Sequence, residues 1–353
     1  MLEIDKNINR AHTLPSDFYT KDDMFKYSID IFEKSHQLIC LDRELKDINV
    51  YPFEYFPEFL NENLVIVRQE ELFSCLSNVC THRAHLLATS REKCKVLQCR
   101  YHGRTFSLDG EIKNAPGFKP EILNDANNKL NKLPLFNWNG FLFISLEDDS
   151  SIIRTLSQID DILPNFPYSD LVDAPQKMEY TVDCHWALYC DNYLEGFHIP
   201  YVHKGLNSDI QWVNYKTKIL DEVILQTALA NKAHQSIKYD DRGDIYAYYF
   251  FIFPNIMINY YNWGISINIV EPISKDKTRI KYMVYNLKDH EIPQGSSSSV
   301  DTVEAEDQEV VLSVQKGLQS RHYKSGKFSP EMERGVHYFH RLISKKTLNL
   351  DVK

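Results

Sequence analysis

The sequence predicts an α+β protein in which a small all-β domain precedes a larger domain that combines an antiparallel sheet with long helices. Three observations support this class. The chain has 353 residues, which is enough for two domains. Short β-type runs fill the stretch from about residue 37 to about residue 147. Longer strand-like runs mixed with helical patterns follow that stretch.

The predicted elements of the first part follow in chain order. Residues 1–37 form a lead-in that we expect to pack on the larger domain, with a helical pattern in DDMFKYSIDIFEKSH. The small domain, residues 38–148, contains the strand candidates LVIVRQ, KVLQC, RTFSLDGEI and GFLFISL. The dipeptide Asp109-Gly110 lies between two β-type runs and predicts a tight turn.

The larger domain, residues 149–353, begins after a polar connector. Its strand candidates are AYYFFIFPNIMINYY, SINIVEP and RIKYMVY. Helical patterns near residues 185–198 and 302–319 flank these strands. We therefore expect a sheet accompanied by a few long helices.

Composition argues against several classes of protein. The formal net charge of -9 does not favour a nucleic-acid-binding surface. No apolar run approaches the ~18 residues that span a bilayer, so no membrane association is expected. The polar N-terminus lacks the apolar core of a secretory signal, and we expect a cytoplasmic location. Seven cysteines without a regular framework fit free thiols or metal ligands better than disulfides.

Two pairs of potential metal ligands lie in the small domain. The pair Cys80 and His82 is followed, after sixteen intervening residues, by the pair Cys99 and His102. Zinc sites with two cysteines and two histidines usually group like with like, whereas here each pair contains one of each. This arrangement suits a two-iron cluster in which one iron binds both cysteines and the other binds both histidines. A zinc site is the alternative interpretation.

A second polar cluster is predicted in CHWALYCDNYLEGFHIPYVHKGL. On a helix, four polar residues share one arc opposite an aromatic face: Asp191, Asn192, Glu195 and His198. No Lys or Arg occurs in residues 178–203 to neutralise the acids of this stretch. Buried carboxylates without nearby cations indicate a bound metal ion.

His198 and His203 are the predicted histidine ligands of that metal. Their spacing would place them about 140° apart on a straight helix. Pro200 lies between them, and we expect it to end or kink the helix so that His203 can return to the metal. Two histidines and one carboxylate leave positions for O2 on Fe(II).

The carboxylate ligand is expected from the segment DTVEAEDQEVVLSVQKGLQS. Asp307 falls near the centre of an apolar helical stripe in this segment, and an acid in the middle of a buried face needs a partner. The four other acids are expected to lie on a solvated face: Asp301, Glu304, Glu306 and Glu309.

With both sites in view, the chain resembles the α subunit, or terminal oxygenase, of Rieske-type non-heme iron oxygenases over nearly its full length. CTHRAHLL and CRYHGRTFSLDG resemble the two ligand loops of Rieske [2Fe–2S] domains, whose usual forms are close to C-x-H-R-G and C-x-Y-H-G-W. Ala84 and Arg104 depart from the commonest residues. Four residues match the family's catalytic signature N-x-x-[D/E]-x-x-H-x4-H: Asn192, Glu195, His198 and His203.

This resemblance implies a [2Fe–2S] cluster, a mononuclear Fe(II) and a homotrimer. It implies a helix-grip catalytic domain, in which a curved antiparallel sheet wraps around a long helix. Asn192 and Glu195 are the implied catalytic residues, and Glu195 would connect the cluster of one subunit to the iron of its neighbour. The sequence contains no GxGxxG motif, so a separate flavin- and iron–sulfur-containing reductase is the expected source of NAD(P)H-derived electrons.

The segments NYLEGFHIPYVH and FPNIMINYYNWG resemble the carnitine and choline monooxygenase branch in particular. The expected reaction is therefore hydroxylation or N-dealkylation of a small organic molecule, with a quaternary ammonium compound favoured. Cationic methyl groups favour aromatic faces, and Tyr260, Tyr261 and Trp263 are candidate substrate contacts. Two alternatives are an oxygenase acting on aromatic or polycyclic compounds, and a zinc-binding or electron-transfer module without oxygenase activity.

Overall fold

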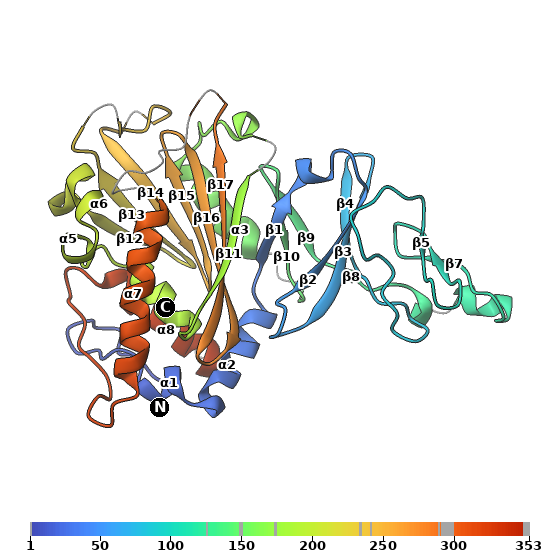
Figure 1. Cartoon of the computed structure of the whole chain (residues 1–353), viewed down its shortest axis with the longest axis horizontal. Coiled ribbons are helices and arrows are strands. Elements are labelled where there is room, and N and C mark those ends of the chain that lie inside the picture. Colours follow the sequence, from blue (N-terminus) through green and yellow to red (C-terminus); the bar gives the residue numbers. More distant parts are fainter. Residues whose placement is uncertain are drawn as a thin grey trace. The chain divides into compact units, whose positions relative to one another are not determined.

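The protein folds into two compact units, seen in the computed structural model (Figure 1). The small unit is Glu33–Ser150, and the large unit combines Met1–Phe32 with Ser151–Lys353. Within the described residues, no helix is both long enough and apolar enough to cross a bilayer. The structure describes residues 2–124, 126–147, 151–172, 175–232, 235–240, 242–288, 290 and 300–348.

Three small antiparallel sheets build the small unit. The first has the order β1-β10-β9, with β1 Gln37–Leu41, β10 Phe141–Ile144 and β9 Leu135–Trp138. The second has the order β2-β3-β4-β8, with β2 Val50–Tyr55, β3 Glu62–Gln69, β4 Leu72–Ser77 and β8 Lys132–Leu133. The third has the order β5-β6-β7, with β5 Leu97–Gln98, β6 Thr105–Phe106 and β7 Ile112–Asn114. Short 3-10 helices accompany them: η1 Asp42–Leu45, η2 Pro120–Asn124 and η3 Ala126–Asn128.

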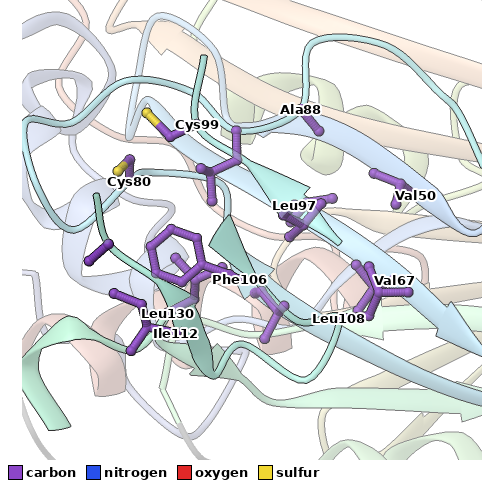
Figure 2. Close-up of a cluster of buried hydrophobic side chains, with 14 residues drawn as sticks. Val50, Val67, Cys80, Ala88, Leu97, Cys99, Phe106, Leu108, Ile112 and Leu130 are labelled. Carbon is purple, nitrogen blue, oxygen red and sulfur yellow. The ribbon is translucent and has the colours of Figure 1, made fainter. Parts of the chain in front are cut away.

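The core of the small unit joins β3 to the third sheet. Val65 and Val67 of β3 are fully buried, as expected for β-branched residues on a central strand. They belong to the same apolar cluster as Phe106, Cys80 and Cys99 (Figure 2). The predicted ligand cysteines are thus anchored in a packed core.

The turn predicted at Asp109-Gly110 is present between β6 and β7. Gly110 has φ +88°, a conformation that glycine adopts without strain. Its amide donates to the carbonyl of Ser107 at 3.0 Å, and a Cβ at this position would lie only 3.2 Å from the carbonyl oxygen of Leu130. The turn prediction is confirmed.

The large unit contains one seven-stranded antiparallel sheet in the order β11-β17-β16-β15-β14-β13-β12. Its strands are β11 Gln176–Val182, β12 Lys216–Leu220, β13 Val223–Leu229, β14 Ile245–Ile252, β15 Ile256–Tyr261, β16 Gly264–Ser274 and β17 Lys277–Asn286. Its helices are α1 Ser16–Thr20, α2 Asp22–Glu33, α3 Ser151–Ile162, α4 Trp186–Tyr193, α5 Ile199–Val202, α6 Lys204–Asp209, α7 Val300–Leu318 and α8 Arg334–Leu348, with the 3-10 helices η4 Tyr168–Asp170 and η5 Trp212–Asn214.

The central strands of this sheet are buried on both faces. Strands β14 and β16 are buried over most of their length on both sides. Helix α4 packs against both β16 and α7, and Figure 1 shows α7 lying across one face of the sheet. The predicted α+β class, with an antiparallel sheet around a long helix, is confirmed.

The segment after α4 departs from the prediction. A single helix over residues 185–198 was expected, but α4 ends at Tyr193. Gly196 then passes so close to Tyr215 that a Cβ would lie 2.7 Å from its ring. Pro200 does not end a helix; it lies in the first turn of α5, where its missing N–H is tolerated.

Candidate functional site

The four predicted cluster ligands lie on two loops of the small unit. Cys80 and His82 follow β4, and Cys99 and His102 follow β5. Both cysteines are only 2% exposed, while the centroids of the two imidazole rings lie 4.7 Å apart. The structure therefore brings all four residues to one place.

Backbone hydrogen bonds fix the two loops. The amide of Cys80 donates to the carbonyl of His85 at 2.9 Å, and the amide of Cys99 donates to the carbonyl of Arg104 at 2.8 Å. Ala84 has φ +55°, in the left-handed region where the usual loop of the family carries glycine. The departure at this position therefore adds local backbone strain.

These residues fit an iron–sulfur cluster. All seven cysteines are free thiols, and Nδ1 of His82 is a buried atom without a hydrogen-bond partner in the described structure. An unsatisfied buried polar atom costs about 1–3 kcal/mol unless a ligand satisfies it. Burial raises the pKa of the Cys80 thiol, so a thiolate here needs a nearby positive charge such as a metal.

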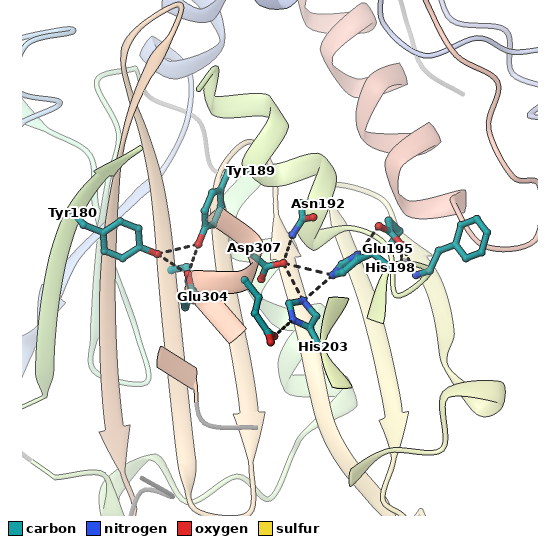
Figure 3. A network of polar contacts seen from close by, with 11 residues as sticks. Tyr180, Tyr189, Asn192, Glu195, His198, His203, Glu304 and Asp307 are labelled. Atoms are coloured by element: carbon teal, nitrogen blue, oxygen red, sulfur yellow. Dashed lines mark hydrogen bonds and ion pairs between the residues drawn. The ribbon is translucent and has the colours of Figure 1, made fainter. Parts of the chain in front are cut away.

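The second predicted site lies in the large unit (Figure 3). His198 immediately precedes α5 and His203 immediately follows it, while Asp307 lies on α7. The Nε2 atoms of the two histidines are 3.1 Å apart. Oδ1 of Asp307 is 3.0 Å from Nε2 of His203 and 3.6 Å from Nε2 of His198. One ligand atom from each residue lies within 4.8 Å of the others.

Neighbouring carboxylates set the protonation of both rings. Oε1 of Glu195 lies 2.6 Å from Nδ1 of His198, and Oε2 of Glu306 lies 2.7 Å from Nδ1 of His203. Because an ionised carboxylate only accepts hydrogen bonds, each Nδ1 carries the hydrogen and each Nε2 presents a lone pair. Two such lone pairs and an Asp307 oxygen at about 3 Å repel one another unless a cation lies between them. The residues fit a metal ion.

The surroundings of Asp307 and His203 complete the site. Asn192, on α4, donates from Nδ2 to Oδ1 of Asp307 and so orients that carboxylate. Burial disfavours a charged His203, but Asp307 and Glu306 outweigh it and raise the pKa of His203. Protons therefore compete with the metal for this imidazole.

Two of the acids that were expected to need a metal ion have other partners in the structure. Asp191 does not face the metal-binding residues, because its carboxylate lies 2.8 Å from Nε2 of His340 and accepts from the hydroxyl of Tyr19. Glu179 is paired with Arg279 at 3.0 Å across β11 and β17. These two acids, which were expected to need a metal, therefore have partners that are distant in sequence.

Two acids of α7 that were expected on a solvated face, Glu304 and Glu306, instead form hydrogen bonds with buried or partly buried side chains. Glu306 holds His203, as described above. Glu304 lies one helical turn before Asp307 and accepts three hydrogen bonds (Figure 3). The donors are the hydroxyl of Tyr180 at 2.6 Å, the hydroxyl of Tyr189, and Nδ2 of Asn268 at 2.6 Å. The side chain of Asp301 lies outside the described residues.

A cavity of about 530 Å³ is lined in part by His198, His203 and Asp307, the three predicted metal ligands. The residues that line it include four acids and no described Lys or Arg. Tyr261 and Trp263 stack on its wall with ring centroids 4.8 Å apart and an angle of 9°. Further tyrosines on the wall are Tyr189, Tyr193, Tyr215, Tyr246 and Tyr249.

Tyr260 does not line this cavity, which corrects one predicted substrate contact. Successive residues of a strand point to opposite faces, so Asn259 and Tyr261 face the cavity while Tyr260 faces away. Tyr260 is fully buried, and its hydroxyl lies 2.7 Å from that of Tyr168. The other two predicted contacts, Tyr261 and Trp263, do line the cavity.

A cysteine–histidine cluster site in one unit and a histidine–carboxylate metal site in the other define an iron-dependent oxygenase with its own electron-storing centre. Residues 170–348 match the family model of the ring hydroxylating alpha subunit (catalytic domain), and residues 35–136 match the Rieske [2Fe-2S] domain. The chain belongs to the family of Rieske-type ring-hydroxylating oxygenase α subunits.

Comparison with individual proteins agrees with this family. The chain is 28% identical to the chloroplastic choline monooxygenase of Amaranthus tricolor over 342 residues, covering 93% of this chain and 76% of that protein. It is 28% identical to the carnitine monooxygenase oxygenase subunit of Escherichia coli (strain K12), covering 96% of this chain and 95% of that protein.

Solved structures share the fold. One structure of a quaternary ammonium Rieske monooxygenase matches with a TM-score of 0.77 and 24% identity, over 98% of this chain and 100% of that one. Naphthalene 1,2-dioxygenase from Rhodococcus sp. matches with a TM-score of 0.74 and 14% identity, over 96% and 95%.

The family establishes the class of enzyme. The chain is an oxidoreductase that uses O2, a Rieske [2Fe–2S] cluster and a mononuclear iron, and it works with a reductase. The predicted terminal oxygenase is confirmed. The zinc-binding alternative is wrong, because the small unit matches the Rieske domain.

Proposed function

We propose that this chain hydroxylates, or N-dealkylates, a quaternary ammonium compound. The iron supplies O2 activation, and the cluster supplies stored electrons. The proposed iron ligands are His198, His203 and Asp307. The proposed cluster ligands are Cys80, His82, Cys99 and His102.

The observation that carries this proposal is the Glu304 carboxylate on the cavity wall. Its three hydrogen-bond donors are neutral, and within the described residues no Lys or Arg forms an ion pair with it. Burial and the charge of Asp307 raise the pKa of Glu304, against the effect of the three hydrogen bonds. A cationic substrate would supply the missing positive charge.

The aromatic wall supports the same kind of substrate. A quaternary ammonium group has no N–H to donate, and its methyl groups favour aromatic faces. The stacked pair Tyr261 and Trp263 offers such faces in the cavity that also contains Glu304. A neutral polycyclic compound would instead have to desolvate the carboxylates of this cavity without compensating their charge.

The lining also bears on which quaternary ammonium compound is bound. A substrate that carries its own carboxylate would need a cationic partner, and the described lining residues include no Lys or Arg. A cation without a carboxylate therefore fits this cavity better than a zwitterion. The choline monooxygenases among the relatives are named for such a cation.

In the proposed site, each protein group has a defined task. Asn192 orients Asp307, while Glu195 and Glu306 orient the two histidines and keep each Nδ1 protonated. Glu304 and the aromatic wall would hold the ammonium group in the cavity that His198, His203 and Asp307 also line.

We further propose a homotrimer in which Glu195 joins two subunits. Large exposed apolar side chains often mark interaction surfaces. In the small unit, Tyr101 is 54% exposed and its ring lies 3.7 Å from that of His102. In the large unit, Tyr201 is 75% exposed, close to His198 and His203 in the chain. Two such different surfaces suit a head-to-tail ring.

The remaining partner is proposed to be a reductase with flavin and iron–sulfur centres, because the chain has no nucleotide-binding motif of its own. One solved structure of similar fold is described as revealing inter-subunit electron transfer in a quaternary ammonium Rieske monooxygenase. The free cysteines support the proposed cytoplasmic location, since thiols persist in reducing compartments.

Single-turnover oxidation tests the substrate class. Protein reduced chemically is exposed to O2 with trimethylammonium alcohols, trimethylammonium carboxylates and aromatic compounds in parallel. We expect hydroxylated or demethylated products from the alcohols and little from the other two panels. Turnover of aromatic compounds alone would contradict the proposed substrate class.

Glu304→Gln tests the charge of the cavity. We expect KM for the trimethylammonium substrate to rise by about 30-fold or more, because a buried charge pair contributes about 2 kcal/mol or more. Binding of the neutral tert-butyl isostere should not weaken. Tyr260→Phe, on the opposite face of β15, is the control and should leave KM unchanged. Equal losses for the cation and its isostere would show that Glu304 has only a structural role.

A further inference from the structure

Arg104 is a buried arginine in the second ligand loop of the small unit. It is 3% exposed and lies two residues after His102, where the usual Rieske loop carries tryptophan. Arginine is almost never buried to this extent unless its charge is compensated. The replacement of an aromatic residue by a buried cation therefore requires an explanation.

The polar contacts of Arg104 do not provide that compensation. Nη1 donates to Oγ1 of Thr81 at 3.1 Å and to Oδ1 of Asn128 at 2.9 Å, and both partners are neutral. Nε has no hydrogen-bond partner among the described residues. No described carboxylate forms an ion pair with this guanidinium. A buried charge in such surroundings needs a negative partner.

The neighbours of Arg104 are the residues of the cluster site. Thr81 lies between Cys80 and His82 in the first ligand loop. The guanidinium carbon lies 4.6 Å from the ring centroid of Phe118, whose ring meets that of His82 edge-on at 5.2 Å. The cation is thus packed among the groups that surround the proposed ligands.

We infer that Arg104 is the counter-charge of the Rieske cluster and raises its reduction potential. On reduction, the cluster gains one electron from the reductase, and its charge becomes more negative by one unit while no bond is made or broken. Arginine side chains in proteins carry a fixed positive charge. Its attraction therefore favours the reduced cluster, and this attraction is strong where water is excluded.

The effect of the Arg104 charge can be distinguished from the effect of the other charges in the same loop. Arg100 lies in the same loop but is exposed, so water and salt screen its charge. Lysine at position 104 would keep the charge and lose the planar guanidinium. The inference concerns only the cluster and is independent of the proposed substrate.

Redox titration of the full-length, cluster-loaded protein tests the inference. Iron and acid-labile sulfide are measured first, and the reduced cluster is followed by electron paramagnetic resonance. At the parental midpoint, Arg104→Gln should shift the oxidised-to-reduced ratio about tenfold towards oxidised, which is about 59 mV for one electron. Arg104→Lys should shift it by less than about threefold, and Arg100→Gln should not shift it.

Two outcomes would overturn the inference. An unchanged ratio in Arg104→Gln with full cluster content would mean that the charge does not act on the cluster. Equal shifts in Arg104→Gln and Arg104→Lys would assign the effect to the hydrogen bonds of the guanidinium. If Arg104→Gln fails to bind the cluster, Arg104→Trp, which restores the usual residue of the family, is titrated in its place with the same expected shift.

Discussion

At saturating iron, Glu195→Gln is expected to keep both metal centres loaded and to slow turnover by about 100-fold. The Glu195 carboxylate holds His198 through Nδ1 at 2.6 Å, and we propose that it also carries the connection to the neighbouring subunit's cluster. Glutamine preserves the size of the side chain but removes its charge. Reoxidation of the prereduced cluster, followed by its visible absorbance after mixing with O2 and substrate, should slow in parallel with turnover.

The chain contains a matched control for this experiment. Glu306 makes the same kind of contact to Nδ1 of the other histidine, at 2.7 Å. Glu306→Gln should weaken iron binding about 10–100-fold but leave cluster reoxidation close to the parental rate once iron is saturating. If both variants lost cluster reoxidation to the same extent, Glu195 would be only a support for His198.

Asp307→Ala is expected to abolish turnover by removing the mononuclear iron. Iron should fall from about three to about two atoms per chain while acid-labile sulfide stays at about two, because the cluster lies in the other unit. Two imidazoles alone, 3.1 Å apart at Nε2, offer neither the charge nor the third ligand that Fe(II) requires. Metal analysis of anaerobically purified protein measures both quantities.

Glu309→Gln, an exposed acid on the same helix, is the control for loss of charge on α7 and should retain all iron. Unchanged iron content in Asp307→Ala would remove this residue from the proposed ligand set. Glu304, nearby on the same helix, would then be the carboxylate to test next.

The spacing of ligands within short segments made both metal sites predictable. Cys80 and His82, like Cys99 and His102, lie within a few residues of each other, so the local chain path determines their separation. Asp307 could be predicted because a carboxylate inside an apolar helical stripe is buried and needs a partner that compensates its charge. Such inferences need only the geometry of one loop or one helix.

The residues that were missed depend on packing between distant segments. Glu306 is revealed as a partner of His203 only when α7 is placed beside α5, and Asp191 contacts His340 of α8 only when that helix is in place. The wrong assignment of Tyr260 has a different cause. Strand β15 carries large apolar or aromatic residues on both faces and Asn259 as its one polar residue, so apolar patterning does not reveal which face lines the cavity, and an error of one residue exchanges the faces.

Helix α7 carries Asp307 and, one turn earlier, Glu304 on the wall of the same cavity. The proposed iron ligand and the proposed partner of the substrate's charge therefore lie on the same helix. Each of these two positions can be substituted without changing the other. We therefore expect that a single substitution at position 304 can change the substrate specificity of this enzyme during evolution, while Asp307 continues to bind the iron.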